Sequence, residues 1–347
     1  MWKHYLVGIL VSLVAGWFFA QTVDFSLMGQ ALASMRLVWL IPCAGLYLIS
    51  YVFRALRWHY LMRPVAHAPF RPLFSALMIG FLGNNLLPAH LGEFVRAYVL
   101  GRDQGVSKSA TFATVVMERV YDGLTVLFLL MIVLLFMELP ERGVEGSHLT
   151  AQGLRTAGWA GLALFAGLMA GLQLLRWQRE RMLDLCRFCL RPLPASLGDK
   201  IVDMAAAFAD GLAVARAGDL LWIILHSFLV WLFLGLYAWS LMPAFGLSLG
   251  PMAGILMEVV IALALLIPSA PAFLGTFHLA AAFTLGYMGA DAGVAGSYAM
   301  MLWLVHFVTT TAIGAWCLWR EGLGWRVLSG AGDRDKPNDI TSSNGFN

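Results

Sequence analysis

Charged residues stand inside apolar sequence at spacings that would bring their side chains together. Glu93 and Arg96 are three residues apart, and Glu118 and Asp122 are four apart, so each pair would share one face of a helix. Arg119 lies within the second pair. Charge inside a bilayer is costly, and it marks either a functional site or a salt bridge that fastens two helices. Since a guanidinium fork matches an anion in two hydrogen bonds, the chemistry these residues suit is anion binding.

Two helix-breaking segments accompany these charges, one at 83–88 (GNNLLP) and one at 268–271 (PSAP). Backbone that leaves the helical conformation at membrane depth must be buried in protein or face water, because lipid offers it no hydrogen-bond partner. The polar residues at or just after the breaks are Asn84, Asn85, Ser269, Thr276 and His278. We therefore predict a polar site within a membrane, lined in part by these side chains.

Composition supports the membrane assignment. Hydrophobic residues make up 60% of the 347 residues and charged residues only 12%, with a mean hydropathy of +0.76. Several apolar stretches reach the roughly 20 residues that cross about 30 Å of hydrocarbon. The six predicted spans are 5–20, 37–53, 110–137, 156–175, 220–242 and 298–319. The breaks split two further apolar blocks, 73–100 and 252–289, which we interpret as re-entrant helical hairpins.

The fold class expected from this pattern is an all-α polytopic membrane protein built as an inverted repeat. Residues 1–329 would form one transmembrane domain, whose halves, about 1–155 and 156–329, each read span, span, hairpin, span. Because each half has an odd number of crossings, the two hairpins would dip from opposite sides. Inverted repeats place substrate sites near the midplane, where discontinuous helices meet. The alternative is that hydrophobic sequence resembles itself by chance.

Basic residues predict the orientation. Of 23 Lys and Arg, 18 fall on one side of this topology, which places both termini in the cytoplasm. Arg54 and Arg63 are either positive-inside anchors or part of the site. A cleaved signal peptide is the alternative for the first segment, but no clear cleavage site follows it. We expect a cytoplasmic amphipathic linker at 176–219 and a disordered polar tail at 330–347.

Other motifs point to no cofactor, no metal and no catalytic residue. Cys186 and Cys189 form a lone CxxC without a second Cys or His pair, and the histidines lack metal-ligand spacing. No Walker loop or dinucleotide fingerprint is present. His226 and His306 lie on spans, where hydrogen-bonded core positions are expected. Glu258 precedes the second break, and an arginine from the first half is its expected partner.

The motifs together resemble one known family. They are RALRW at 54–58, GN at 83–84, LP at 87–88, GEFVR at 92–96, ER at 118–119 with Asp122, and PSAP at 268–271 with Gly275. They look like the lysylphosphatidylglycerol synthase transmembrane-region family, also called the flippase-like domain family. The resemblance covers most of the chain. Three residues depart from the pattern: His90 replaces a basic residue, Ala272 replaces Gly, and His278 replaces an acidic residue, which puts substrate identity in doubt.

The resemblance implies a lipid transporter of the bacterial inner membrane that moves an anionic or phosphate-bearing lipid between leaflets. Arg96, Arg119 and Arg57 would hold the headgroup, while Glu93, Glu118 and Asp122 would orient the arginines or carry protons. The soluble aminoacyl-transferase domain of the bifunctional synthases is absent, so we do not expect the chain to be an enzyme that makes an aminoacyl-lipid. The expected partner is membrane lipid and not nucleic acid, and the sequence leaves homo-oligomerisation open.

Three alternatives stay open at this point. An integral-membrane transferase acting on a lipid-linked substrate would need a carboxylate pair, which Glu118 and Asp122 could supply. An ion or proton channel would use the same charged core without moving lipid. A structural partner of an envelope complex would tolerate neutral substitutions at Glu93 and Arg96.

Overall fold

The computed structural model describes residues 25–87, 91–137, 178–190, 217–267 and 270–323, together with a few single positions. The predicted spans at 5–20 and 156–175 therefore lie largely outside the described residues, as do most of the linker, the tail, and Pro88, His90, Pro268 and Ser269 at the breaks. The first break was predicted to begin at Gly83, but residues 83–86 are the last turn of a helix that ends at Leu86, so this break begins later than predicted. Within the described ranges the secondary structure is helical throughout, with turns and short connecting segments between the helices. The all-helical part of the prediction is confirmed.

Four helical stretches are long and apolar enough to cross a membrane among the described residues: Leu37–Met62, Lys108–Phe136, Gly218–Phe245 and Ala292–Arg320. They correspond to four of the six predicted spans. They contain η1 (Leu37–Trp39), α3 (Leu40–Met62), α6 (Lys108–Phe136), α10 (Ala217–Leu241), η2 (Met242–Phe245) and α13 (Ala292–Arg320). The number of crossings and the re-entrant character of the hairpins remain expectations.

The two split blocks each form a pair of shorter helices. The first pair is α4 (Phe70–Leu86) and α5 (Gly92–Asp103), and the second is α11 (Pro251–Ala264) and α12 (Thr276–Tyr287), with the short η3 (Pro271–Phe273) between them. In each pair the two helices pack against each other. The remaining helices are α2 (Phe25–Ser34) and α8 (Arg179–Leu190).

Glycines permit close packing within each half. A Cβ atom on Gly92 of α5 would lie 1.9 Å from the carbonyl oxygen of Gly80 on α4. A Cβ atom on Gly254 of α11 would lie 2.1 Å from the carbonyl oxygen of Gly235 on α10. Real Cβ atoms do not approach so closely, so both contacts require glycine, as in membrane helix pairs that pack through small residues.

Contacts between helix ends show which ends lie together. At one end, Arg63 after α3 pairs with Asp219 in the first turn of α10 at 2.5 Å, and Ser75 of α4 donates to Glu321 after α13 at 2.9 Å. At the other end, the Arg36 amide before η1 donates to the Ala244 carbonyl of η2 at 3.1 Å. Thus α3 and α13 run in one direction, and α10 runs in the opposite direction.

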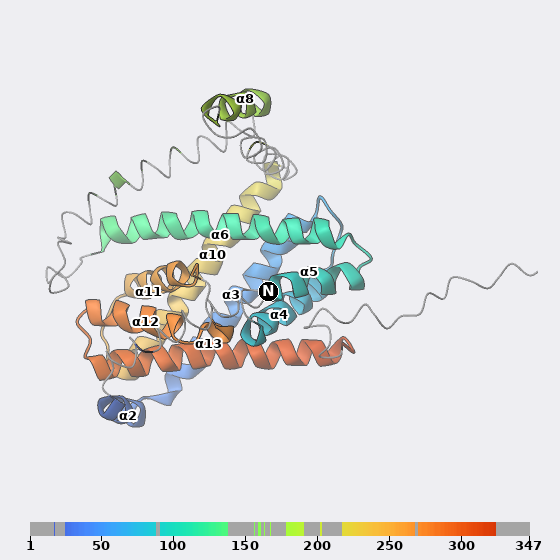
Figure 1. Cartoon of the computed structure of the whole chain (residues 1–347). Coiled ribbons are helices and arrows are strands. Elements are labelled where there is room, and N and C mark those ends of the chain that lie inside the picture. Colours follow the sequence, from blue (N-terminus) through green and yellow to red (C-terminus); the bar gives the residue numbers. More distant parts are fainter. Residues whose placement is uncertain are drawn as a thin grey trace, which may run out of the picture.

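The hairpins consequently enter the bundle from opposite ends. The α4–α5 pair begins and ends near the first of these ends, where the end of α5 joins α6. The α11–α12 pair begins just after η2 and ends just before α13, at the other end. Figure 1 shows α4 and α5 between the long helices α6 and α13 at one end, and α11 and α12 between them at the other. The inverted repeat, which also includes the two spans outside the described residues, stays a prediction.

Candidate functional site

Seven charged side chains from three helices form one group, most of it buried, which we call the arginine–carboxylate cluster. Helix α3 contributes two arginines, α5 one carboxylate and one arginine, and α6 two carboxylates and one arginine. The members are Arg54, Arg57, Glu93, Arg96, Glu118, Arg119 and Asp122. All six charged site residues predicted from the sequence are therefore brought together, and Arg54 joins them.

Glu118 lies at the centre of the cluster and is fully buried. Its Oε1 atom is 3.0 Å from Arg57 Nη2 and 3.4 Å from Arg119 Nη2, and its Oε2 atom accepts from Arg96 Nη2 at 2.5 Å. Arg54 Nη1 approaches Oε1 at 3.9 Å. Because α3, α5 and α6 each supply at least one of these arginines, Glu118 ties the three helices together.

Asp122, one turn further along α6, continues the network toward α10. Its Oδ1 atom accepts from Arg57 Nη1 at 2.7 Å and from the Trp231 indole of α10 at 3.2 Å. Its Oδ2 atom is 3.4 Å from both Arg54 Nη1 and Arg119 Nη1. Arg57 also donates to the Ser227 hydroxyl at 3.0 Å. Every carboxylate oxygen of Glu118 and Asp122 thus contacts an arginine.

The ion pairs shown by α5 run between helices and not along one helix. The spacing of Glu93 and Arg96 predicted that their side chains come together, but Arg96 binds Glu118 and Glu93 binds Arg119 Nε at 3.1 Å. Arg96 also lies 4.2 Å from the Trp58 ring centroid, a cation–π contact. The prediction was wrong on the partners because i,i+3 spacing says nothing about α6, which packs alongside α5.

In the cluster, arginines outnumber carboxylates, and N–H donors outnumber the acceptor sites of the carboxylates. Four arginines against three carboxylates leave 4 − 3 = 1 positive charge. Four guanidinium groups carry about 20 N–H donors, whereas three carboxylates accept about 12 hydrogen bonds. The Nε atoms of Arg54, Arg57 and Arg96 are buried and have no hydrogen-bond partner among the described residues. Such a group suits an additional acceptor with negative charge.

The residues predicted at the breaks lie apart from these ion pairs, along α13 and within the hairpins. Asn85 donates to Thr310 Oγ1 of α13 at 2.8 Å and to Thr311 Oγ1 at 3.0 Å. Asn84 is buried beside Gly92, its Oδ1 atom 2.6 Å from where a Cβ on that glycine would lie. These two residues shape the α4–α5 hairpin and its contact with α13.

In the second hairpin, Thr276 donates to the Phe273 carbonyl at 3.1 Å, and the His278 ring packs 5.1 Å from that of Trp303 on α13. Trp303 in turn donates to the Ala272 carbonyl at 2.8 Å. Ser269 lies outside the described residues. These contacts are structural and show no charge facing the arginine–carboxylate cluster.

The two breaks approach each other, as expected. The segment η3 at the second break packs against α4, which ends at the first. Both breaks also contact α13. Trp303 donates to the Ala272 carbonyl of η3, and Thr310 accepts from Asn85. Trp303 and Thr310 are seven residues, or about 10 Å, apart along α13.

Two residues, Arg54 and Glu258, differ from what the sequence predicted or left open, and one prediction, for His306, is confirmed. Arg54 was left between anchor and site, although its spacing from Arg57 puts both on one face of α3. Glu258 is buried, but its Oε1 atom has no hydrogen-bond partner and no arginine pairs with it among the described residues. His306 is a hydrogen-bonded interface residue as predicted, through Tyr47 Oη at 2.6 Å, and Tyr47 also bonds Tyr51 at 2.7 Å.

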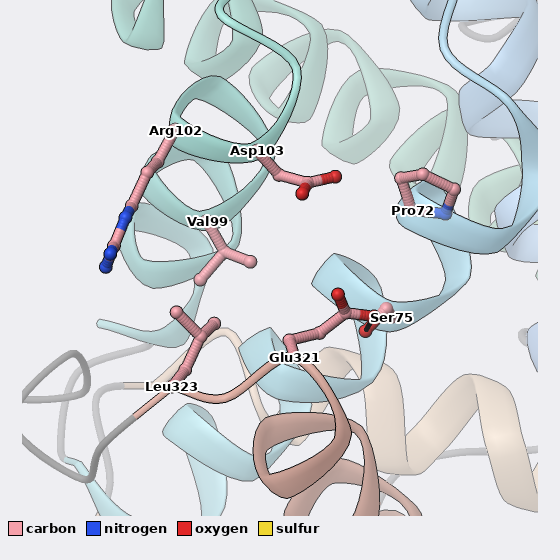
Figure 2. A pocket seen from close by; sticks show the side chains of 7 residues that line it. All are labelled: Pro72, Ser75, Val99, Arg102, Asp103, Glu321 and Leu323. Atoms are coloured by element: carbon pink, nitrogen blue, oxygen red, sulfur yellow. Dashed lines mark hydrogen bonds between the residues drawn. The ribbon is translucent and has the colours of Figure 1, made fainter.

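Two cavities lie near the ends of the bundle and share no residue with the cluster. One of about 270 Å³ is lined by Pro72, Ser75, Val99, Arg102, Asp103, Glu321 and Leu323 (Figure 2). The other, of about 630 Å³, lies between α2, η2 and the start of α13. Within the described part of the chain, no group of three or more His, Cys, Asp or Glu residues could hold a metal ion.

Comparison with known proteins identifies the family. The glycosyltransferase AglD of Haloferax volcanii is 28% identical over 124 residues, which are 35% of this chain and 20% of that protein. UPF0104 membrane proteins of Methanocaldococcus jannaschii and Methanothermobacter thermautotrophicus are 33% identical over 90 residues and 35% over 103. These two alignments cover 25% and 29% of this chain, and 26% and 30% of those proteins.

No solved structure matches the chain significantly. The sequence profile described as the lysylphosphatidylglycerol synthase TM region, however, matches residues 5–314, which include every helix of the cluster and both hairpins. The chain therefore belongs to the lysylphosphatidylglycerol synthase transmembrane-region family.

Proposed function

We propose that this protein is a lipid transporter that moves an anionic or phosphate-bearing lipid between the leaflets of a bacterial inner membrane. The observation that carries the proposal is the surplus of arginine charge and donors in the buried arginine–carboxylate cluster. A phosphate offers the acceptors and the negative charge that this surplus lacks. In this proposal the hairpins dip into the membrane from opposite sides, and the headgroup crosses between them while acyl chains stay in lipid.

Within the proposal the arginines have different tasks. Arg57 and Arg96 are almost wholly buried and bridge helices through Glu118, so they position the cluster and supply positive potential. Arg119 is exposed enough to contact a headgroup directly, and Glu93 orients it. Glu118 and Asp122 keep the buried arginines from repelling one another.

One alternative has a specific observation in its favour, the partial match to a protein named a glycosyltransferase. A transferase acting on a lipid-linked substrate would use Glu118 and Asp122 as acid and base. Every oxygen of both carboxylates already contacts an arginine, however, which suits them poorly to proton transfer. A radiolabelled sugar-donor assay separates this alternative from transport, and conductance measurements in a planar bilayer separate an ion or proton channel.

A charge-swap experiment tests the transport proposal. Purified protein in liposomes should accelerate exposure of a fluorescent phosphatidylglycerol to an impermeant quencher. The double variant Glu93→Arg, Arg119→Glu keeps an ion pair but moves the positive charge from α6 to α5. Because residue 119 also faces Glu118 and Asp122, the thermal midpoint of the swap is measured first. If the pair only fastens helices, a swap that folds normally should retain activity, whereas a headgroup site on α6 should lose most of it.

The matched control is the Arg63→Asp, Asp219→Arg swap at the end of the bundle, which should retain transport. The proposal would be contradicted if wild-type protein moved no lipid. It would also be contradicted if the Glu93–Arg119 swap transported lipid at the full rate. Glu93 and Arg119 are chosen because the structure pairs them.

A further inference from the structure

Arg119 differs from the other arginines of the cluster in reaching the protein surface. Its side chain is 40% exposed, compared with 8% for Arg54, 0% for Arg57 and 3% for Arg96. It stands 11 residues after the start of α6, or about 16 Å along the helix. Half of a hydrocarbon core of about 30 Å is about 15 Å, so this charge reaches the surface near the middle of the span.

The exposed face of α6 around Arg119 is otherwise apolar. Val116 is 45% exposed and Leu127 is 41% exposed, and Gly123 lies between them on the same face. A Cβ atom on Gly123 would have no neighbour within 4 Å, so the space one turn after Arg119 is open. On its inner side the Arg119 guanidinium contacts Glu93, Glu118 and Asp122. On its exposed side lipid tails offer no acceptor, so a negatively charged group that binds there is favourable.

We propose that this stretch of α6 is a lateral portal for a lipid. Arg119 binds the phosphate of a headgroup that carries one net negative charge. The headgroup enters through the open space at Gly123, and the acyl chains remain against Val116 and Leu127. The inference rests on the proposed transport function and adds the point of access and the class of substrate. The apolar flanks favour a lipid over free phosphate, since a soluble anion gains nothing from them.

The charge of the cluster sets the preference for a monoanion. Its excess of one positive charge is neutralised by one phosphodiester with an uncharged headgroup, such as that of phosphatidylglycerol. A second negative charge would remain uncompensated in a partly desolvated site, which is unfavourable. A zwitterionic lipid brings an ammonium group next to arginines, which weakens its binding by repulsion.

Binding by the full-length protein tests the portal. Delipidated protein would be titrated with phosphatidylglycerol, phosphatidylcholine and phosphatidic acid at a pH where the last carries two charges, and bound lipid would be counted by native mass spectrometry. We expect phosphatidylglycerol to bind most tightly. Arg119→Gln should weaken its binding about tenfold, as expected for loss of one charge-assisted contact. The control Arg63→Gln removes a comparably exposed, carboxylate-paired arginine and should leave binding unchanged.

Blocking the open space gives an independent test. A leucine at 123 would lean toward the preceding turn of α6 and cover Arg119, and its Cβ atom would meet no neighbour within 4 Å. Gly123→Leu should therefore reduce phosphatidylglycerol binding as much as Arg119→Gln does, with unchanged thermal stability. Gly286→Leu is the matched control, because this exposed glycine of α12 also has no neighbour within 4 Å.

The outcomes separate the portal from the transport function. If wild-type protein neither binds nor moves any anionic lipid, the proposed function fails. If it moves phosphatidylglycerol and both Arg119→Gln and Gly123→Leu bind it normally, only the portal is overturned. The portal is also overturned if Gly286→Leu is equally impaired, or if inorganic phosphate displaces the lipid at equal concentration. Tighter binding of phosphatidic acid would overturn the monoanion preference.

Discussion

At the scale of single residues, the carboxylates and not the arginines hold the cluster together. Glu118→Gln keeps the shape of the side chain but removes the carboxylate that Arg96 binds, and it leaves Arg57 with Asp122 alone. Removing one partner of a buried ion pair costs about 3–5 kcal/mol. We expect that loss in the free energy of unfolding, seen as a lower thermal midpoint in detergent.

Glu93→Gln serves as the comparison for this prediction. Its partner Arg119 still contacts Glu118 and Asp122 after the substitution, so we expect a smaller loss than for Glu118→Gln. Equal destabilisation by the two substitutions would contradict the central role given to Glu118. The membership of the cluster could be predicted from charge in apolar sequence. Its pairing could not, because it depends on how α5, α6 and α3 pack, and local spacing shows only which residues share a face.

At the scale of elements, glycine contacts determine whether the hairpins can form. Gly92→Ala would place its Cβ atom 1.9 Å from the Gly80 carbonyl oxygen and 2.6 Å from the backbone nitrogen of Asn84. Both are backbone atoms, which cannot move without separating α4 from α5. We expect a severe loss of folded protein, measured by size-exclusion chromatography and thermal unfolding. Gly45→Ala is the control, since its Cβ would meet nothing within 4 Å and alanine favours the helix.

A Gly92→Ala protein as stable as the Gly45→Ala protein would show that α4 and α5 do not pack as described. The existence of both hairpins could be predicted from Pro and Gly interrupting apolar blocks. Their detailed geometry could not. Ala272, which stands where the family resemblance leads one to expect glycine, has φ 57° and ψ 16°, a left-handed conformation that glycine adopts without strain. The structure thus gives the reason for that expectation.

At the scale of the whole molecule, the packing of helix ends supports the sidedness that the basic residues predict. Two of the 18 basic residues assigned to the cytoplasmic side, Arg54 and Arg57, are buried in the cluster and are not anchors. The remaining 18 − 2 = 16 still outnumber the three on the other side. Arg63, Arg102 and Arg320 adjoin helix ends that the structure gathers at one end of the bundle. Among the described residues, these three arginines therefore lie at one end of the bundle.

The orientation of that end is a prediction that labelling can check. The four native cysteines would first be replaced, and a single cysteine then introduced in place of Asp103 or Asp291, two exposed aspartates at opposite ends of the bundle. An impermeant maleimide added to intact cells should label the Asp291→Cys protein. It should label the Asp103→Cys protein only after the inner membrane is permeabilised, because the end rich in Lys and Arg stays in the cytoplasm. The opposite pattern would invert the topology while leaving the arrangement of the hairpins intact. Labelling of both positions from outside would mean that the two ends do not lie on opposite sides of a membrane, and transport between leaflets would lose its structural basis.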